Sequence, residues 1–506
     1  MEISPKIIKI LIDEFVGSEG YRDMLAGERY FKIKNDILCR KLNQYSFYNQ
    51  DTKQVEKKIN QNKSDEHLPH SFYKKQVNQK KTYIASKPIT IVYNTPTDGN
   101  KKTESQKREE KKITNLVWNK LGYNFEELIK NRIVDASNSG RAWLHPNYKD
   151  GKLVFEKYAS KECRPIYDNE TGSYLVGMIH FYTIEDLEEN KDKIYVEFWD
   201  ENEVRYYIEE RQSDGSESIF VEDVTRPRSG CHFTREVYDS VLNNLVKVEK
   251  HSWGKVPFIE IKNNEERETD LKPIKNLIDA YDLIDSNYVN TIEDLKEIIW
   301  LINGYGAEDL LALIENLKVN GVARTNDTNG SIDAKLLQIP YEAREALLKR
   351  LKELIYEFGR AVDTTNKDLI GQAPSGVSLE FLYSDLDMKA DDIITSLRAS
   401  IYEVLWYVLY DLKMENQVNA NINEFDFKIE FNKSRIFNEI EKVQALSSDQ
   451  TLSTKTKLEK HPWVDDPDIE MQRIKEEKEE NIKRQQEIFG NTGGFQDNHN
   501  DEDNQE

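Results

Sequence analysis

Cysteine is scarce in this chain. Only three are present among 506 residues, Cys39, Cys163 and Cys231, and they show neither a CxxC spacing nor an even number that could pair. This excludes a disulfide scaffold as the basis of the fold, and a structural zinc site is not expected. Such sparse cysteine usage fits a reducing compartment.

Long apolar runs are also missing. The most apolar window, Ile401–Tyr410, is interrupted by Glu403 and is far shorter than the roughly 20 residues that span a bilayer, so no membrane segment is expected. The N-terminal stretch MEISPKIIKILIDEF carries charges among its apolar residues and has no small-residue cleavage site, so it does not resemble a signal peptide. We expect the chain to be cytosolic where it is made.

The common catalytic motifs are absent. The sequence contains no GxxxxGK[ST], HExxH, GxSxG or GxGxxG. The single close pair of histidines, His67 and His70, flanks Pro69 instead of sharing a helix face, so it is a poor candidate for metal ligation. We therefore expect no enzymatic activity, no metal and no cofactor.

Aspartates gather at two places, and they leave one catalytic alternative open. Two-metal nucleases need converging carboxylates, so a metal-dependent nuclease is a rival hypothesis. Acids near helix N-termini have a simpler explanation, because they complement the helix dipole and cap the first turn. We favour this structural interpretation for both clusters, which are Asp385, Asp387, Asp391 and Asp392, and then Asp465, Asp466 and Asp468.

Positive charge is in short supply. The chain has 71 Lys and Arg against 92 Asp and Glu, a formal net charge of −21. Such a surface repels phosphate, which argues against tight binding of nucleic acid but not against a nucleic acid that passes by. Residues 51–87 are locally rich in lysine, with Tyr73 and Tyr83 interspersed. They fit either a nucleic-acid strip or an ordinary solvated face, and the interspersed acids favour the second.

What the chain does have is helical periodicity. Its length suggests about three cooperating units. Apolar residues recur at a spacing of three and four along one seam from Leu271 to Leu295, broken only by Asp285, and again from Leu347 to Ala361. This spacing predicts two long helices that bury a stripe against other helices, as in a stalk. The seam consists of Leu271, Ile274, Ile278, Tyr281, Tyr288, Ile292 and Leu295.

The remaining segments predict a mixed fold. In residues 142–261, apolar and polar residues alternate over short runs, as they do in β-strands, and Asn169–Gly172 and Ser213–Gly215 fit hairpin turns. This pattern indicates a mainly β region. A small α/β module separates the two stalk helices. A loop rich in Thr, Asn, Gly and Pro follows the second stalk helix at 363–376, and a largely buried helix is expected at Met388–Leu412. Pro467 should begin a charged helix.

Seven segments follow one another along the chain: HSFYKKQVNQKKTYIASKPITI (70–91), SGRAWLH (139–145), DGKLVF (150–155), RPIYD (164–168), HSWGKVPFIEIKNN (251–264), the run 271–295, and PSGVSLEFLY (374–383). In this order they resemble the portal proteins of tailed bacteriophages, in particular the large portal family of phages that infect Gram-positive hosts. The resemblance spans about residues 20–475.

The resemblance implies an α+β portal-protein fold with a mixed α/β wing, a long-helix stem, a small α/β clip and a helical C-terminal crown. The implied boundaries are 1–265 for the wing, 266–297 for the first stem helix, 298–340 for the clip, 341–362 for the second stem helix, 363–387 for a tunnel loop and strand, 388–435 for a buried wing helix and strand, 436–488 for the crown and 489–506 for a disordered acidic tail.

The resemblance also implies a function. Portal proteins form a ring, usually dodecameric, at one capsid vertex of the virion, through which double-stranded DNA is packaged and ejected. Implied partners are the terminase, a head-completion or adaptor protein, and capsid and scaffolding proteins. Within this frame Asn366, Lys367 and Gln372 would face the DNA from the tunnel loop. The seam residues Leu271, Ile274, Ile278, Tyr281, Ile292 and Leu295 would pack between subunits. Another head-tail connector ring is a further alternative, but such adaptors are usually much shorter.

Overall fold

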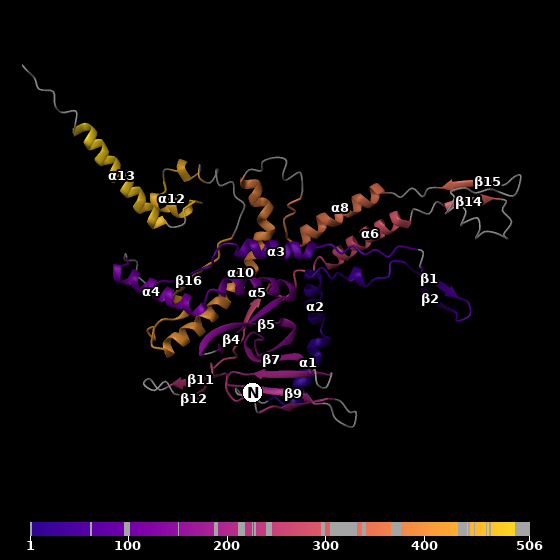
Figure 1. Ribbon diagram of the computed structural model, residues 1–506, viewed down its shortest axis with the longest axis horizontal. Helices are drawn as coiled ribbons and strands as arrows, with labels where there is room; N and C mark the ends of the chain where they lie inside the picture. The colour runs from indigo at the N-terminus through magenta and orange to yellow at the C-terminus, as the bar shows by residue number, and fades with distance from the viewer. Residues whose placement is uncertain are drawn as a thin grey trace, which may run out of the picture. The chain divides into compact units, whose positions relative to one another are not determined.

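The computed structural model describes most of the chain, and Figure 1 shows the described elements in colour. The described residues are 3–60, 63–95, 102–149, 151–186, 191–210, 218–224, 226, 229–238, 245–294, 299–303, 331–335, 341–365, 376–433, 443, 446–449, 451–461, 463–464 and 467–490. By its internal contacts the chain divides into two units. The first comprises Met1–Asp363 and Ser384–Ser434, and the second comprises Thr364–Tyr383 and Arg435–Glu506.

The first unit begins with two short capped helices, α1 (Pro5–Gly17) and α2 (Glu19–Phe31). The side chains of Ser4 and Ser18 each accept a hydrogen bond from a backbone N–H in the first turn, which satisfies one donor left unpaired at each helix start. One face of α1 enters an apolar core with the largest sheet. That core includes Ile8, Ile12, Ile179, Val196, Phe198 and Tyr207.

The part from Arg141 to Lys262 is built of antiparallel strands, which confirms the predicted β region. One sheet has the order β10-β9-β8-β7-β6, a second has the order β13-β4-β5, and β11 pairs with β12. Gly172, in the first predicted hairpin turn, has a φ of 64°. The second predicted turn, Ser213–Gly215, lies outside the described residues. The elements are β4 (Arg141–Lys149), β5 (Lys152–Tyr158), η2 (Ser160–Glu162), β6 (Cys163–Tyr167), β7 (Leu175–Asp186), β8 (Lys191–Trp199), β9 (Val204–Glu210), β10 (Ile219–Glu222), β11 (Phe233–Tyr238), β12 (Leu245–His251) and β13 (Ile259–Lys262).

Helices and a small hairpin complete the N-terminal half of this unit. The short helix η1 (Asp36–Cys39) precedes the hairpin β1 (Gln44–Asn49) and β2 (Gln54–Ile59). Strand β3 (Thr90–Tyr93) pairs with β16 (Phe427–Glu430), which follows η4 (Glu424–Asp426) more than three hundred residues later in the chain. The helices are α3 (Phe72–Ala85), α4 (Glu104–Leu121) and α5 (Phe125–Ser139).

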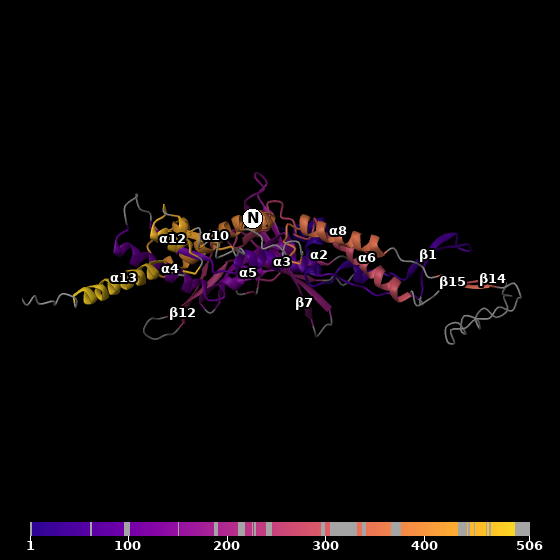
Figure 2. The ribbon, with the colours of Figure 1, turned by 90° about the horizontal axis from the view of Figure 1, so that it is seen from above.

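The two predicted stalk helices are α6 (Lys275–Asp294) and α8 (Tyr341–Phe358), and they lie side by side in both Figure 1 and Figure 2. Between them in sequence, β14 (Ile299–Asn303) pairs with β15 (Ser331–Lys335), which agrees with strands in the predicted small module. Residues 304–330 of this predicted module lie outside the described residues.

The long helix α10 (Gly376–Met414) corrects one expectation, since it begins twelve residues before Met388. The expectation of a loop and strand is therefore wrong for residues 376–387, which are helical. The reason is visible in Tyr383, Leu386 and Ala390, which are buried at a spacing of three and four. Farther along, the fully buried Ile401, Val404, Leu405 and Val408 confirm the predicted buried helix.

In the second unit the described elements outside α10 are α12 (Thr454–Lys460) and α13 (Pro467–Gly490). Ser453 caps α12, and α13 begins at Pro467 as predicted, because proline loses nothing at a first helical position. None of the described helices is both long and apolar enough to cross a membrane.

Candidate assembly surfaces

The predicted channel-side residues cannot be placed. Asn366, Lys367 and Gln372 lie outside the described residues, as does Leu295 of the predicted seam. The loop leading to them is anchored just before this gap, because the Lys352 ammonium lies 2.9 Å from the Asp363 carboxylate.

Three residues of the predicted seam lie inside the single chain. Leu271, Ile274 and Ile278 are 1%, 0% and 0% exposed. They form one apolar cluster with residues of α2, α3 and α8, among them Ala26, Tyr30, Tyr73, Val77 and Ile355. These three residues are thus part of the fold of one chain, and the prediction that they pack between subunits is wrong for them. The periodicity predicted their burial but not the partner that buries them.

The other seam positions differ from these three. Tyr281 is half-buried and packs edge-on against the rings of His70 and Phe72. Ile292, near the end of α6, is 50% exposed. Near this end of α6 the two helices are in contact, because the Arg344 guanidinium of α8 lies 5.6 Å from the centre of the Tyr288 ring. Of the predicted seam residues that the structure describes, Ile292 is therefore the most exposed.

A polar ladder along α6 went unnoticed in the sequence. Asp282, Ser286 and Asn290 accept hydrogen bonds of 3.0, 3.0 and 2.8 Å from the backbone N–H groups of His70, Leu68 and Glu66. Four residues of helix advance about 6.0 Å and two residues of extended chain about 6.6 Å, so every fourth helix residue meets every second residue of the segment. The signal was a polar series at i, i+4 and i+8 beside the apolar seam of the helix.

His70 closes one end of this ladder. Its Nδ1 lies 2.8 Å from Asp282 Oδ1 and its Nε2 lies 3.1 Å from Asp285 Oδ2. Asp282 is fully buried and also accepts a 2.6 Å hydrogen bond from the Asn35 amide. Burial would lower the pKa of His70, but the two carboxylates outweigh it, so that pKa is raised above its ordinary value. Asp285, which breaks the apolar seam, therefore favours the protonated form of the His70 imidazole.

The first aspartate cluster is occupied by cations. The Lys433 ammonium lies 2.7 Å from Asp387 and also bonds Asp391, while the Tyr83 hydroxyl donates to Asp387 at 2.8 Å. Arg360 lies 3.9 Å from Asp392. Across the part of the chain that the structure describes, no group of three or more His, Cys, Asp and Glu side chains could hold a metal ion. Asp387, Asp391 and Asp392 make ion pairs, so their geometry gives the nuclease hypothesis no support.

The aromatic residues of the lysine-rich stretch are not available to a nucleic acid. Tyr73 and Tyr83 are 1% and 3% exposed, so neither ring could stack on a base. Lys80 is 1% exposed, and its ammonium bonds Asn263 Oδ1 at 2.6 Å and Asp270 Oδ2 at 3.1 Å. Burial lowers the pKa of Lys80 to about 8, although Asp270 opposes this shift. Part of this stretch therefore belongs to the interior.

Asp270 is the centre of this buried group. The Lys389 ammonium of α10 lies 3.3 Å from the same carboxylate oxygen. Burial alone would raise the pKa of Asp270, but Lys389 and Lys80 reverse the effect and hold it far below the ordinary value. Residues from α3, from the start of the α6 region and from α10 are thus joined by one carboxylate that must stay charged.

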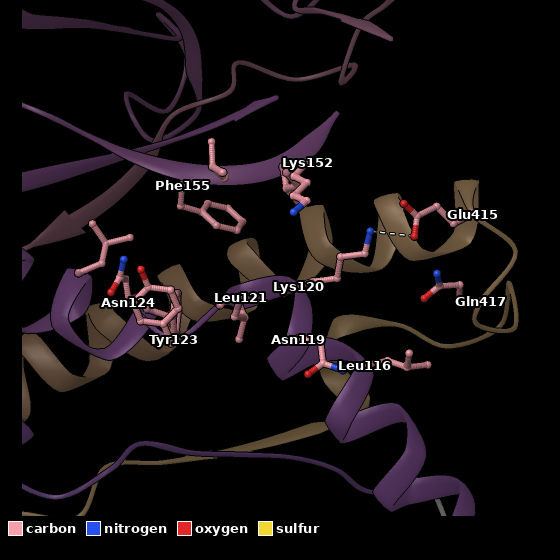
Figure 3. A pocket seen from close by; sticks show the side chains of 15 residues that line it. Leu116, Asn119, Lys120, Leu121, Tyr123, Asn124, Lys152, Phe155, Glu415 and Gln417 are labelled. Atoms are coloured by element: carbon pink, nitrogen blue, oxygen red, sulfur yellow. Dashed lines mark ion pairs between the residues drawn. The ribbon is translucent and has the colours of Figure 1, made fainter. Parts of the chain in front are cut away.

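A pocket of about 750 Å³ lies where α4, α5, β5 and the end of α10 meet, as Figure 3 shows. At its rim the Lys120 ammonium lies 2.6 Å from Asp411 and 2.8 Å from Glu415. The lining is mainly apolar, and Lys120 is already paired with both carboxylates. The residues that Figure 3 labels on its wall include Leu116, Leu121, Tyr123, Lys152, Phe155 and Gln417.

Throughout the described residues, the buried polar groups named above bind one another and leave no arrangement that resembles a catalytic centre. A family model described as "Phage portal protein, SPP1 Gp6-like" matches residues 17–484. The chain therefore belongs to this family of phage portal proteins, as its sequence motifs predicted.

Individual relatives agree with the family match. The portal protein of Bacillus phage SPP1 is 25% identical over 497 residues, which cover 96% of this chain and 90% of that protein. The portal protein of Clostridium phage phiCD119 is 27% identical over 467 residues, which cover 88% and 90%. A chain from a solved structure, the neck of an empty GTA particle computed with C6 symmetry, aligns with a TM-score of 0.38 and 11% identity over 77% of this chain and 89% of that one.

Proposed function

We propose that the protein assembles into a closed ring of identical copies at one vertex of a phage capsid, and that double-stranded DNA passes through this ring during packaging and ejection. The observation that carries the proposal is the family match over residues 17–484, together with two portal proteins that align along 90% of their own length. A dodecamer is the subunit number we propose. The protein acts in this role without catalysis.

The parts of the chain fit this role in order. The helices and sheets of residues 1–265 would form the wing, α6 and α8 the stem, and the β14–β15 pair part of the clip. The buried part of α10 and strand β16 belong with the wing, and α12 and α13 with the crown. The separate contact unit that contains Arg435–Glu506 supports a crown distinct from the wing.

The channel lining is proposed from the loop between α8 and α10. Asn366, Lys367 and Gln372 would reach the DNA there, with Lys367 making a transient contact to phosphate. The net charge of −21 supports a channel of low friction, because few cations are available to hold the phosphates. Ile292 and Tyr281 remain proposed contributors to the contacts between subunits.

We also propose the partners that such a ring needs. The clip would dock the terminase during packaging and a head-completion or adaptor protein afterwards. The wing would contact capsid and scaffolding proteins. The ring would then be assembled in the host cytoplasm and retained in the virion.

Native mass spectrometry of the purified protein, with negative-stain images of the same sample, tests the ring. We expect one dominant assembly whose mass is an integer multiple of the chain mass near twelve copies, and particles with a central hole. A sample that stays monomeric or dimeric at every concentration would refute the proposal. EDTA-sensitive cleavage of DNA by that sample would move the function to the nuclease alternative.

A further inference from the structure

An amine and a carboxamide meet inside the first unit. Lys80 lies on α3 and Asn263 directly follows β13, and the two residues are 1% and 2% exposed. Lys80 Nζ lies 2.6 Å from Asn263 Oδ1. Because a C=O bond is about 1.23 Å long, Nζ is no farther than about 3.8 Å from Asn263 Cγ. This separation is close to the about 3–3.5 Å at which a nucleophile attacks.

The Asp270 carboxylate bridges the two groups. Its Oδ2 lies 3.1 Å from Lys80 Nζ, and its Oδ1 accepts a 2.9 Å hydrogen bond from Asn263 Nδ2. The same amide nitrogen also donates to Glu268 O at 2.9 Å, which holds the amide with its carbonyl oxygen toward Lys80. One carboxylate therefore faces both the nitrogen that could attack and the nitrogen that could leave.

The local charges favour a reaction between the two side chains. Asp270 Oδ2 is shared by two ammonium groups, because Lys389 of α10 lies 3.3 Å from it. Burial lowers the pKa of Lys80 to about 8, against the opposing effects of Asp270 and the more distant Asp392, so neutral amine is accessible near that pH. Conversion of Lys80 to an amide would leave Lys389 and Asp270 as a one-to-one ion pair. A buried excess of positive charge would thereby disappear.

We propose that Lys80 and Asn263 join in an intramolecular isopeptide bond. The neutral Lys80 Nζ attacks Asn263 Cγ, a bond forms between these atoms, and the bond from Cγ to Nδ2 breaks. Asp270 takes the proton that the attacking nitrogen loses and passes it to the leaving nitrogen, so the carboxylate starts and ends charged. Amine and carboxamide give amide and ammonia, and no oxidant or other co-reactant is needed.

The surroundings suit such a step. A pocket of about 600 Å³, lined mainly by polar side chains, includes Lys80, Asn263 and Asp270 in its wall and offers ammonia a route to solvent. The step happens once in each chain and turns over no substrate, so it is a modification of the protein. It is independent of the proposed ring.

The bond would brace the first unit. It would tie α3 to the end of the β region and close a loop from residue 80 to residue 263. A crosslink across a long loop restricts the unfolded chain strongly. All three cysteines are free, and an amide crosslink, unlike a disulfide, does not depend on an oxidising compartment.

Cleavage with cyanogen bromide tests the bond in the full-length protein. The reagent cuts after methionine, and Met178 is the only methionine between Lys80 and Asn263. The protein is first incubated above the pKa of Lys80. We expect fragments 25–178 and 179–388 to stay joined on a denaturing gel with reductant. Tandem mass spectrometry of the joined species should place the branch at Lys80 and Asn263, with the loss of one ammonia.

Two arginine variants provide the control. Lys80→Arg keeps a positive charge but cannot attack, because a guanidinium does not release its proton, so its fragments should separate. Lys81→Arg makes the same change at the next residue and should leave the fragments joined. Lys80→Arg digested in parallel also measures the background from incomplete cleavage at Met178. Asp270→Asn should leave little joined product, because it removes the group that transfers the proton.

The unmodified chain decides the proposal even if a variant fails to fold, because its two fragments are either joined or separate. Complete separation, or a branch at other residues, refutes the isopeptide bond and leaves Lys80, Asn263 and Asp270 as a buried hydrogen-bonded group. If Asp270→Asn gives as much joined product as the unmodified protein, the proton transfer through Asp270 is refuted and the bond stands. None of these results bears on the ring, which native mass spectrometry tests separately.

Discussion

At the scale of single residues, charged groups inside the first unit hold distant segments together. His70 binds Asp282 and Asp285 of α6, and Asp270 binds both Lys80 and Lys389. Removing one partner from such a buried pair leaves a charge without compensation, which is costly. The sequence indicated none of these pairs, because partners more than a hundred residues apart leave no local pattern.

His70 makes folding stability depend on pH. Because its pKa is raised in the folded chain, its ion pairs stabilise fully below the ordinary histidine pKa near 6.5, and that stabilisation is lost as pH rises through the higher folded value. We expect His70→Gln to lower the free energy of unfolding in acid by about 1.5 kcal/mol, the scale of a hydrogen bond to a charged group, and by less in alkali.

Urea unfolding between about pH 5.5 and pH 8.5 measures this dependence. The quantity to plot against pH is the difference in the free energy of unfolding between the unmodified protein and His70→Gln. The comparison cancels the groups that titrate in both proteins. The pH dependence of Asp285→Asn should lie between those of the unmodified protein and His70→Gln, since it removes one of the two carboxylates that face the imidazole. A difference in unfolding free energy that stays constant over the whole pH range would mean that the charge of His70 does not stabilise the fold.

At the scale of elements, α6 has two roles along its length. Its beginning packs into the core of the first unit through Ile274 and Ile278, and its end is exposed at Ile292. We expect Ile274→Ala to lower the free energy of unfolding by about 2–5 kcal/mol, because it opens a cavity in a closed cluster, and Ile292→Ala to change it by less than about 0.5 kcal/mol.

Chemical denaturation of both variants, at a concentration that keeps the protein monomeric, tests whether the two ends of α6 differ in this way. If Ile274 packed between subunits instead, both variants would unfold like the unmodified monomer and differ only in assembly. Equal losses for Ile274→Ala and Ile292→Ala would contradict the division of α6 into a core end and an exposed end.

The sequence allowed the type of most elements to be predicted but not their packing partners. The heptad spacing correctly indicated that α6 and α8 bury a stripe, yet the same spacing fits burial within one chain and burial between chains. The start of α10 was missed for a similar reason, since a Gly- and Pro-containing stretch reads as a loop until the buried spacing of Tyr383, Leu386 and Ala390 is known. Long-range pairings such as β3 with β16 need the fold itself.

At the scale of the whole molecule, the acidic excess limits how tightly the protein can bind DNA. Each Lys or Arg that neutralises a phosphate releases a counterion, so tight binding to DNA would appear as a steep fall in affinity with rising salt. A chain with a net charge of −21 offers few such contacts over its surface. Free movement of DNA through a ring requires this weakness, because firm contacts would have to be broken at every step.

We therefore expect the assembled protein to leave double-stranded DNA unshifted on a native gel near physiological salt, and any residual binding to change little between about 50 and 200 mM salt, a range over which a protein with many phosphate contacts loses several orders of magnitude in affinity. Lys367→Ala should not alter this result, since one transient contact contributes little at equilibrium. The assembly should be tested with linear DNA and with covalently closed circles, because a circle cannot thread a closed ring. Tight, salt-sensitive binding to both forms would place a basic DNA-binding surface on the outside of the protein and contradict a channel that works by weak contact.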